Sequence, residues 1–454
     1  MWRRYPRGRA PRRRQDQTAR SSGSARPYFE SQQRPPAERR GVPTSRRRMP
    51  QDDEPGGHAG RRRTPQPGRT IATVIVASLL SLAVATGLGV VLLYDNWNGN
   101  IHRVSLGDRV KNRPAKQHVT GPLEPMNILV MGSDARSGVG NGIDGESGGG
   151  VSDTTILFHL SADREFAYGI SIPRDTAVMR PTCYEADGSE IPASTSYAKW
   201  NAAYAVGGPF CTVQQFEQLT GIRVDNYLVV DFNKFKDMVD ALDGVEVCIP
   251  HDIDDPEHDV HLEAGTQELL GEEALDYFRV RYGISGGIDP NRTRRQQAFI
   301  GSMITKALAT DMLARPDRLI RFMNAATSSL QTDFRNGAQI ADLALTAKGV
   351  GLGDIKFVTT PWLFSDKVSS GVEWAPEVED LWRLVRRDQP LTAEFLENAL
   401  SAGDPPGGTS RATDGPSTTS GTRSGTPSEG SSPAPGKPES GLDAAGRAAA
   451  GLCT

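Results

Sequence analysis

The chain has 454 residues and a formal net charge of −3 at pH 7, but its charge is unevenly distributed. Residues 1–69 contain nineteen Arg, no Lys and six acidic residues, and the remainder is acidic. This arm and the Ser/Gly/Pro-rich residues 396–454 have too little apolar surface to form a packed core. We therefore expect a disordered segment at each end and a folded domain between them.

Residues 70–94 form a continuous uncharged run, TIATVIVASLLSLAVATGLGVVLLY. A helix of about twenty residues already crosses the hydrocarbon of a membrane. Arg61, Arg62, Arg63 and Arg69 precede the run, so the positive-inside rule predicts a cytoplasmic arm and an extracellular domain in the cell membrane. A cleaved signal peptide would have a shorter apolar run nearer the N-terminus, and a buried core helix is the other alternative. We predict a single-pass anchor at 70–94 and a juxtamembrane linker at 95–122.

Four cysteines follow the anchor, in a compartment that permits disulfides. Cys183 and Cys211 both lie in loop-like sequence with Gly and Pro, which favours a bond between them. Cys248 lies in the apolar run 245–249 and is interpreted as a buried strand thiol. Cys453 lies in the C-terminal tail. No CxxC spacing is present, so the sequence does not support a zinc ribbon or a redox motif.

Strand and helix patterns alternate along the central part of the chain. This alternation predicts an α/β fold, a three-layer α/β/α sandwich with a mixed central sheet. A Gly-rich stretch at 138–150 lacks the P-loop pattern and is interpreted as a mobile flap. The predicted strands are 127–131, 154–160, 166–172, 227–230, 245–249, 274–282 and 357–360, and the predicted helices are 213–219, 232–242, 292–313, 318–330 and 376–387.

Charged residues follow or open three neighbouring predicted strands. Asp134 and Arg136 come after the first strand, Asp153 opens the second, and Arg174 and Asp175 follow the third. Each residue alone is typical of a solvated turn. Open α/β sheets bind ligands at the ends of their strands, so the gathering of opposite charges there predicts a site.

The segment 276–282 (DYFRVRY) is predicted as a strand with Arg279 and Arg281 on one face. Two residues advance about 6.6 Å along a strand, so the two guanidinium groups could bind neighbouring phosphoryl groups. The alternative is a pair of exposed arginines on an edge strand.

A helix is predicted to begin with Asp289 as its N-cap residue. Arg292, Arg294 and Arg295 fall in its first turns, where the helix dipole disfavours cations by about 0.3–1 kcal/mol each. A bound phosphate at the helix N-terminus would offset that cost, and Arg292 lies one turn from Gln296 on the same face. The alternatives are pairing with Asp289 or simple solvation.

Two carboxylates beside a pyrophosphate are suited to share a magnesium ion. Asp134 and Asp153 are therefore candidate ligands of Mg²⁺, with Mn²⁺ as an alternative, and phosphate oxygens would complete the coordination. Lys199 would supply a further positive charge. Asp153, Asp134 and Asp175 remain alternatives for the base that deprotonates an acceptor hydroxyl.

These short motifs, in this order behind one transmembrane helix, resemble the LytR-CpsA-Psr family of cell-wall ligases. The resemblance covers about residues 123–390 and implies a catalytic domain at 123–395 with an apolar tunnel for a polyprenyl chain. It implies Mg²⁺-dependent transfer of a phosphoglycan from polyprenyl pyrophosphate to peptidoglycan. It implies Asp153, Arg174 and Arg281 as catalytic residues and Asp134 and Asp153 as metal ligands. The implied pyrophosphate contacts are Arg136, Arg174, Lys199, Arg279, Arg281, Asp289, Arg292 and Gln296. The motifs themselves are Gly132–Arg136, Ser152–Thr155, Pro173–Thr176, Lys199–Asn201 and Arg279–Arg281, followed by Asp289, Arg292 and Gln296.

The sequence leaves three alternatives: a hydrolase, a transcriptional attenuator and a zinc site. The same site could hydrolyse polyprenyl pyrophosphate with water as the acceptor. The basic arm could make the protein a transcriptional attenuator, but it has no helix-turn-helix pattern, so we expect no specific nucleic-acid binding. His251, His258 and His261 match no common zinc spacing and are interpreted as loop residues.

Overall fold

The computed structural model describes residues 67–116, 118–119, 123–133, 151–185, 187–256, 259–280, 284, 288–404, 406 and 444–453. The chain divides into a unit of residues 1–71 and a unit of residues 72–454. The described residues belong to the second unit, apart from residues 67–71, which begin the first helix.

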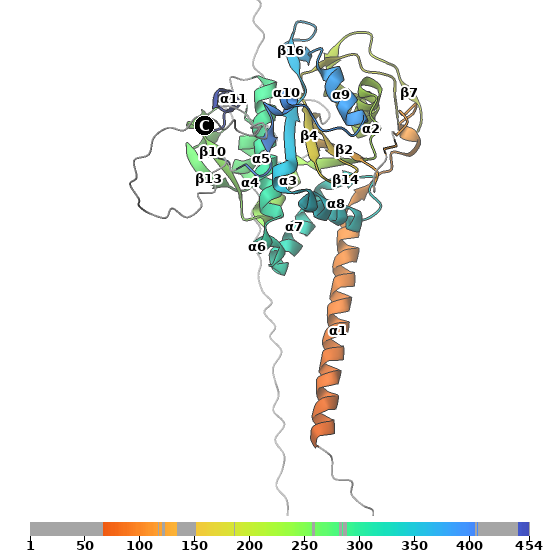
Figure 1. Cartoon of the computed structure of the whole chain (residues 1–454), viewed down its shortest axis with the longest axis vertical. Coiled ribbons are helices and arrows are strands. Elements are labelled where there is room, and N and C mark those ends of the chain that lie inside the picture. Colours follow the sequence, from red (N-terminus) through yellow and green to blue (C-terminus); the bar gives the residue numbers. More distant parts are fainter. Residues whose placement is uncertain are drawn as a thin grey trace, which may run out of the picture. The chain divides into compact units, whose positions relative to one another are not determined.

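A long apolar helix opens the described chain. Helix α1, Pro67–Asn100, contains a 33-residue stretch, Gly68–Asn100, that is long and apolar enough to cross a membrane, and its apolar window has no buried residues (Figure 1). The predicted anchor at 70–94 is therefore part of a longer helix. Trp97 Nε1 donates to Asn324 Oδ1 at 2.8 Å, and Asn98 Oδ1 accepts from the Gly337 amide at 2.8 Å. The predicted linker is thus corrected, because it begins as helix and continues into the first strand of the sheet.

The centre of the domain is an eight-stranded sheet in the order β1-β14-β9-β2-β3-β4-β15-β18. Strand β3 is antiparallel to β2 and β4, whereas β2 runs parallel to β9 and β4 runs parallel to β15. The predicted mixed α/β sheet is confirmed. The strands are β1 (His102–Arg103), β14 (Leu330–Thr332), β9 (Asn226–Asp231), β2 (Met126–Ser133), β3 (Ser152–Leu160), β4 (Ala167–Ile172), β15 (Ile355–Thr359) and β18 (Leu400–Ser401).

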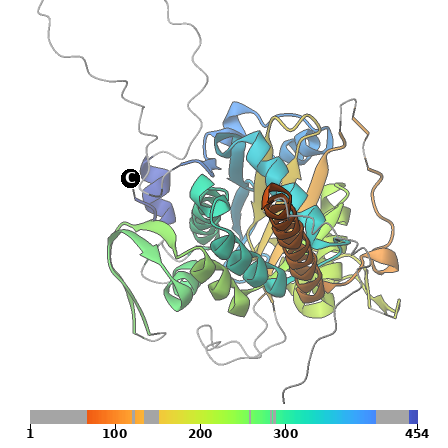
Figure 2. The same cartoon turned by 90° about the horizontal axis from the view of Figure 1, so that it is seen from below.

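Helices cover both faces of this sheet (Figures 1 and 2). On β4, Tyr168 and Ile170 pack in a core with residues of α2 and α9, whereas Ala167 packs in a second core with α11. Burial on both faces explains why strand sequences are apolar almost throughout. The helices are α2 (Ala202–Thr220), α3 (Phe232–Ala241), α4 (Gly271–Arg279), α5 (Asp289–Ala307), α6 (Thr310–Leu313), α7 (Pro316–Ser329), α8 (Gly337–Val350), α9 (Val378–Arg386), α10 (Ala393–Leu396) and α11 (Ala444–Ala450).

Short two-stranded sheets lie outside the eight-stranded central sheet. Of these strands, only β10 was predicted from the sequence, at 245–249, because most of the others are too short to leave a pattern. They pair β5 (Ala177–Val178) with β8 (Ala198–Lys199), β6 (Cys183–Tyr184) with β7 (Glu190–Ile191), β10 (Val245–Ile249) with β13 (Gly265–Leu269), β11 (Ile253–Asp255) with β12 (Val260–Leu262), and β16 (Trp362–Ser365) with β17 (Gly371–Trp374).

The predicted strand at 274–282 is wrong. Residues Gly271–Arg279 form helix α4, and Arg279 is its last residue. Glu272 and Glu273 lie in the first turn, where the helix dipole stabilises acidic side chains. Leu275 and Phe278 are buried three residues apart on one face. This helical spacing outweighs the apolar–basic alternation at the end of the segment.

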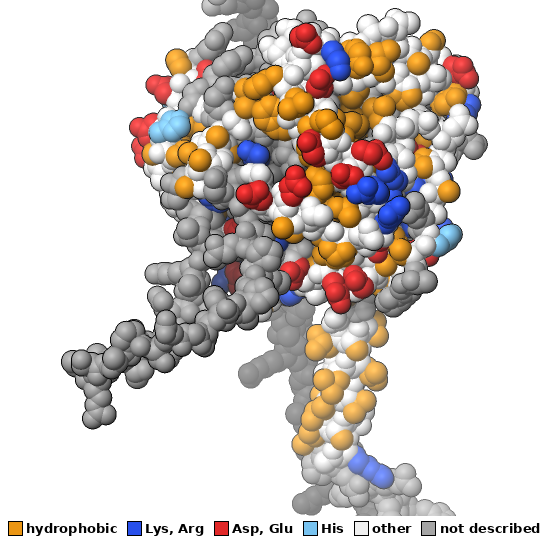
Figure 3. Space-filling view, turned by 45° about the horizontal axis from the view of Figure 1, so that its top comes forward, with side chains coloured by type: hydrophobic (Ala, Val, Ile, Leu, Met, Phe, Trp, Pro, Cys, Tyr) orange, Lys and Arg blue, Asp and Glu red, His pale blue; other side chains and the backbone are white. Residues whose placement is uncertain are grey.

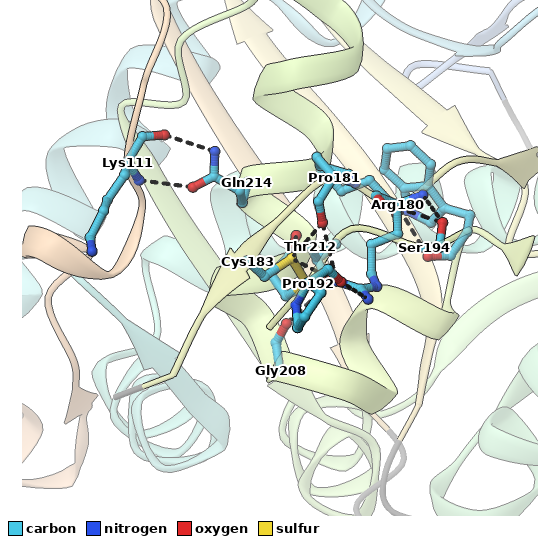
Figure 4. The surroundings of a disulfide bond; sticks show 12 residues. Lys111, Arg180, Pro181, Cys183, Pro192, Ser194, Gly208, Thr212 and Gln214 are labelled. Carbon is cyan, nitrogen blue, oxygen red and sulfur yellow. Dashed lines mark hydrogen bonds between the residues drawn. A yellow bond between two sulfur atoms is a disulfide. The ribbon is translucent and has the colours of Figure 1, made fainter. Parts of the chain in front are cut away.

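The predicted disulfide between Cys183 and Cys211 is confirmed, and it ties β6 to helix α2 (Figure 4). Both cysteines are fully buried. Arg180 closes the neighbouring loop, because its Nη2 donates to the Pro192 carbonyl at 2.6 Å. Helix α2 breaks just before Cys211 at Gly208, whose φ of +61° favours glycine.

The interpretation of Cys248 as a free strand thiol is wrong, because Cys248 bonds Cys453 across 205 residues. The C-terminal residues also contribute to the core: Leu452 packs with Phe357 of the central sheet. Strand β18 pairs with β15 beyond the predicted domain end at 395. The domain therefore extends into the segment 396–454 predicted as a tail. The average composition of that segment conceals these short structured pieces.

Candidate functional site

The predicted charge cluster forms at one end of the central sheet. Ser133 at the end of β2 pairs with Ser152 at the start of β3, and Thr155 of β3 pairs with Ile172 at the end of β4. This register places Asp153 beside the segment that follows β4. The end of β9 lies there too, since Ser133 also pairs with Asp231. The expectation that strand ends gather these residues is confirmed for the described ones.

Arg174 is the centre of the cluster. Its Nη1 forms an ion pair and hydrogen bond with Asp153 Oδ1, and its Nε lies 3.6 Å from Asp289 Oδ1 and 4.0 Å from Asp175 Oδ1. Burial alone would lower the pKa of the Arg174 guanidinium, but the three carboxylates together raise it above its usual value. Arg174 is therefore a permanent buried cation that joins residues from three segments.

The first turns of α5 supply the next contacts. Arg292 Nη2 lies 2.8 Å from Asp289 Oδ1 and donates to the Asp153 carbonyl at 3.4 Å. Gln296 Oε1 accepts from Thr154 Oγ1 at 3.2 Å. The predicted N-cap is one residue off, because Ile288 is the N-cap residue and Asp289 is already helical. The Asp289 side chain pairs with Arg292 of the same helix, as one alternative predicted, and with Arg174 in the turn after β4.

Lys199 reaches the cluster from strand β8. Its Nζ lies 2.9 Å from Asp175 Oδ1. Burial, and then the negative charge of Asp289, raise the pKa of the Asp175 carboxyl above its ordinary value, although Lys199 and Arg174 oppose the shift. Asp175 is thus a carboxylate with increased basicity beside a half-exposed lysine.

Arg279 approaches from the C-terminal end of α4. Its guanidinium carbon lies 5.6 Å from the centroid of the Phe232 ring, at the point where β9 gives way to α3. This cation–π contact holds the buried guanidinium at the same end of the sheet. Asp134, Arg136 and Arg281 lie outside the described residues, as does the Gly-rich stretch 138–150.

Arg295 has a structural role that the sequence does not reveal. It is fully buried, its Nε donates to the Tyr277 carbonyl at 3.3 Å, and its Cζ lies 5.5 Å from the Tyr277 ring centroid. Burial lowers the pKa of Arg295 to about 10. The alternative that Arg295 is solvated is therefore wrong. This residue links α5 to Tyr277 of α4.

Tyr204 was not expected from the sequence. It lies on α2, and burial raises the pKa of its hydroxyl, although the nearby Ser133 side chain opposes the shift. Nearby, Trp200 Nε1 donates to Thr155 Oγ1 at 3.2 Å. Both residues follow Lys199 closely in the chain, but an isolated tyrosine gives no pattern that distinguishes a site residue from a core residue.

Several buried polar atoms in the cluster make no hydrogen bond among the described residues. They are Nε of Arg174, Nε of Arg292 and Oδ2 of Asp289. A buried donor without an acceptor costs about 1–3 kcal/mol, more when it is charged. Two unsatisfied guanidinium donors at one helix N-terminus are suited to an anionic ligand with several oxygen acceptors.

The described residues provide only part of a metal site. No group of three or more His, Cys, Asp or Glu side chains suited to a metal ion occurs in this part of the chain. Asp153 offers a hard oxygen donor and is also paired with Arg174. This donor set fits a Mg²⁺ ion held largely by phosphate oxygens and water, and it does not fit a site built from protein ligands alone.

A cavity of about 630 Å³ lies at the opposite end of the sheet. Its lining includes Met126 at the start of β2, Leu160 at the end of β3 and Asn226 at the start of β9. It is therefore separate from the charge cluster and adds no residue to it.

The chain matches known proteins over this domain. The LytR_cpsA_psr family model covers residues 97–383, more than half of the chain. The probable cell wall biosynthesis protein LcpB of Corynebacterium glutamicum is 31% identical over 66% of this chain and 68% of its own length. The cell wall biosynthesis protein LcpA of the same organism is 28% identical over 52% of this chain and 49% of its own length. The polyisoprenyl-teichoic acid–peptidoglycan teichoic acid transferase TagV of Bacillus subtilis is 29% identical over 59% of this chain and 65% of its own length. The chain belongs to the LytR-CpsA-Psr family.

Proposed function

We propose that this protein transfers a phosphoglycan, of teichoic acid, arabinogalactan or capsule type, from polyprenyl pyrophosphate to peptidoglycan. The observation that carries the proposal is the pair of buried guanidinium groups of Arg174 and Arg292, beside the N-terminus of α5. Among the residues that the structure describes, the Nε atoms of both have no hydrogen-bond acceptor. The similarity to a relative named as a teichoic acid transferase supports the same activity.

The charges suit phosphoryl transfer, which depends mostly on positioning and charge neutralisation. Arg174 and Arg292 would bind the pyrophosphate oxygens, and Lys199 would add a point charge. Asp289 would orient both arginines rather than contact the substrate, since a carboxylate repels phosphate and both guanidinium groups already lie beside it. Arg279, Arg281, Arg136 and Gln296 stay proposed contacts from the resemblance.

The reaction exchanges one oxygen on phosphorus for another. An acceptor hydroxyl of peptidoglycan attacks the glycan-linked phosphorus, the bridging P–O bond breaks, and polyprenyl phosphate leaves. We favour Asp175 as the base that takes the hydroxyl proton, because its raised pKa brings it closer to the operating pH than an ordinary aspartate. The Lys199 Nζ lies 2.9 Å from Asp175 Oδ1, and its positive charge would stabilise the negative charge that develops on the phosphate oxygens.

A magnesium ion, or manganese in its place, would neutralise phosphate charge when bound. Asp153 would be one protein ligand, and Asp134 is proposed as the second from the resemblance. We also propose that the arm before α1 is cytoplasmic and the domain extracellular, on the basis of the arginines that precede the anchor.

The test is transfer of a labelled glycan from polyprenyl pyrophosphate to peptidoglycan fragments by the full chain in detergent with Mg²⁺. Arg292→Ala should lower kcat/KM about 100-fold or more, as expected for loss of a preorganised donor to developing charge. The matched control is Arg383→Ala on α9, a half-exposed arginine that pairs with Asp380 of its own helix, its one ion pair within the described part of the chain. Equal activity of both variants would contradict the proposed phosphate site.

A hydrolase is the second candidate, because water could take the place of the acceptor hydroxyl at the same charges. Release of free glycan phosphate at the same rate with and without peptidoglycan fragments would favour it.

A further inference from the structure

The cavity at the end of the sheet opposite the charge cluster has no part in the proposed reaction. Its volume of about 630 Å³ lies in the range of small-molecule sites, about 300–1,000 Å³. Asp153 and Leu160 mark the two ends of the sheet on β3, and seven residues of strand between them span about 23 Å. A ligand of this cavity is therefore not the pyrophosphate proposed for the cluster.

Charged side chains of both signs line the cavity. They are Arg164, Arg335, Asp333 and Asp342. The Nε atom of Arg164 is buried and makes no hydrogen bond with a described residue. Arg335 and Asp342 form no ion pair within the described part of the chain. Two arginines and two carboxylates around one cavity suit a ligand that carries both a negative and a positive group, because each buried charge needs a partner.

The charged wall belongs to a turn that hydrogen bonds hold in place before α8. Asn336 caps the helix, since its Oδ1 accepts from the Gln339 amide at 3.0 Å. Gln339 Oε1 in turn accepts from the Arg335 amide at 2.9 Å. Asp333 Oδ1 accepts from the Tyr227 amide of β9 at 3.0 Å. The turn is thus fixed both to its own helix and to the central sheet.

The same turn contacts the end of the membrane helix. Asn98 Oδ1 of α1 accepts from the amide of Gly337, which lies between the lining residues Arg335 and Gln339. Figure 3 shows the hydrophobic side chains of α1 continuing up to the domain. The apolar run ends at Tyr94, and the four residues from there to Asn98 rise about 6 Å. Lipid head groups occupy about 5–7 Å beyond the hydrocarbon, so this turn lies at head-group depth.

We propose that this cavity binds the head group of a zwitterionic phospholipid, of the phosphatidylethanolamine type, from the leaflet on the domain's side. Arg164 and Arg335 would bind the phosphate, and Asp342 would accept from the ammonium group. The glycerol ester and the first acyl carbons would lie against apolar side chains that also line the cavity, among them Met126 and Leu160.

The charges distinguish this lipid from others. A head group with a phosphate alone, such as phosphatidylglycerol, would leave the carboxylates of the cavity without a cation. The trimethylammonium of phosphatidylcholine has no N–H to donate to Asp342. The bound lipid would give the domain a second contact with the membrane besides α1, and this inference does not depend on the proposed function.

The test measures binding of a fluorescent, short-chain phosphatidylethanolamine to the full chain in non-ionic detergent. Arg335→Ala should raise Kd about ten-fold or more, as expected for loss of a charge-assisted hydrogen bond. The matched control is Arg321→Ala, because Arg321 is also exposed, lies on α7, which contacts α1, and does not line the cavity. Its Kd should equal that of the unmodified chain.

A second variant changes the volume of the cavity and leaves its charge unaltered. Thr346 lines the cavity from α8, so Thr346→Trp should fill part of it and raise Kd by a similar factor. Thermal unfolding without lipid checks that each variant is folded. Added phosphatidylethanolamine should raise Tm in the unmodified chain and in Arg321→Ala, and should leave Tm unchanged in Arg335→Ala and Thr346→Trp.

Three outcomes would overturn the inference. The first is an unchanged Kd in either folded cavity variant. The second is equal affinity for phosphatidylglycerol and phosphatidylethanolamine, which would remove the selection for a zwitterion. The third is displacement of the fluorescent lipid by polyprenyl phosphate at a lower concentration than by unlabelled phosphatidylethanolamine, which would assign the cavity to the lipid of the glycan donor.

Discussion

Asp289 has the most demanding position among the charged residues, because one carboxylate lies beside two buried arginines. A buried ion pair stabilises a fold little more than apolar packing would. Removing one partner, however, leaves the other charge buried and unpaired, which costs about 3–5 kcal/mol of stability. The Asp289 carboxylate lies 2.8 Å from Arg292 Nη2 and 3.6 Å from Arg174 Nε. Attraction between Asp289 and the two arginines therefore holds the cluster together when no ligand is bound. An anionic ligand would bind the same two arginines beside Asp289.

Asp289→Ala should lower Tm and make the protein respond more strongly to added inorganic pyrophosphate. The variant leaves Arg174 and Arg292 with less negative charge nearby, so a bound anion should restore more stability than in the unmodified chain. Thermal unfolding with and without pyrophosphate gives the comparison. A Tm that pyrophosphate changes in neither protein would count against an anion site at these arginines.

Asp276 gives a prediction on pH. Burial, and then repulsion by Glu272, raise the pKa of Asp276 to about 6 from 3.8. The folded state then binds more protons than the unfolded state between those values, so this residue lowers stability as pH rises from about 4 to 6. Asp276→Asn should remove that part of the pH dependence and raise Tm at pH 7.5 more than at pH 4. An equal shift in Tm at both pH values would contradict the assignment.

Sequence reasoning named most residues of the charge cluster but few of their contacts. Arg174 was predicted from a strand end and Arg292 from a helix start, and both local patterns are kept in the structure. Lys199 was predicted only as a further positive charge. The pairing of Arg174 with Asp289 joins segments more than a hundred residues apart, and no local pattern encodes it. Arg279 was placed on a strand, because apolar–basic alternation over a few residues fits either a strand or the end of a helix.

At the scale of elements, the C-terminal helix α11 is the clearest departure from expectation. Arg447 on α11 donates through Nε to the Cys453 carbonyl at 2.6 Å, and Ala450 and Leu452 are buried against the sheet. The Cys248–Cys453 bond fixes this segment to β10. An element of seven residues between low-complexity sequence and the chain end gives too little periodicity to predict.

Cys453→Ser should destabilise the domain by about 2–5 kcal/mol, because the disulfide closes a long loop and holds apolar residues in the core. Cys248→Ser should cost about the same, and the double variant should cost no more than either single one, since all three lose one bond. Denaturant unfolding measures the differences. Additive losses would show that the two cysteines act independently of their bond.

At the scale of the whole molecule, the anchor and the domain are continuous. Helix α1 extends past the predicted apolar run and contacts α7 and α8 through Trp97 and Asn98, and β1 then joins the central sheet. Apolar length predicts where a helix crosses a membrane. It cannot predict where that helix ends in water, because the ending depends on contacts with a distant part of the domain.

Protease added to intact cells should degrade the domain and leave the N-terminal arm protected. The four arginines before the run favour a cytoplasmic arm. Epitope tags placed at residue 10 and after residue 453 report the two sides by immunoblotting, with permeabilised cells as the control for both tags. Loss of the N-terminal tag from intact cells would reverse the proposed orientation.

The most direct measurement of the proposed function is the stoichiometry of the reaction products. With a labelled glycan on polyprenyl pyrophosphate, peptidoglycan fragments and Mg²⁺, each polyprenyl phosphate released should match one glycan phosphate joined to peptidoglycan through a new phosphodiester. Polyprenyl phosphate released together with free glycan phosphate, and no label on the fragments, would contradict transfer and leave a pyrophosphate hydrolase.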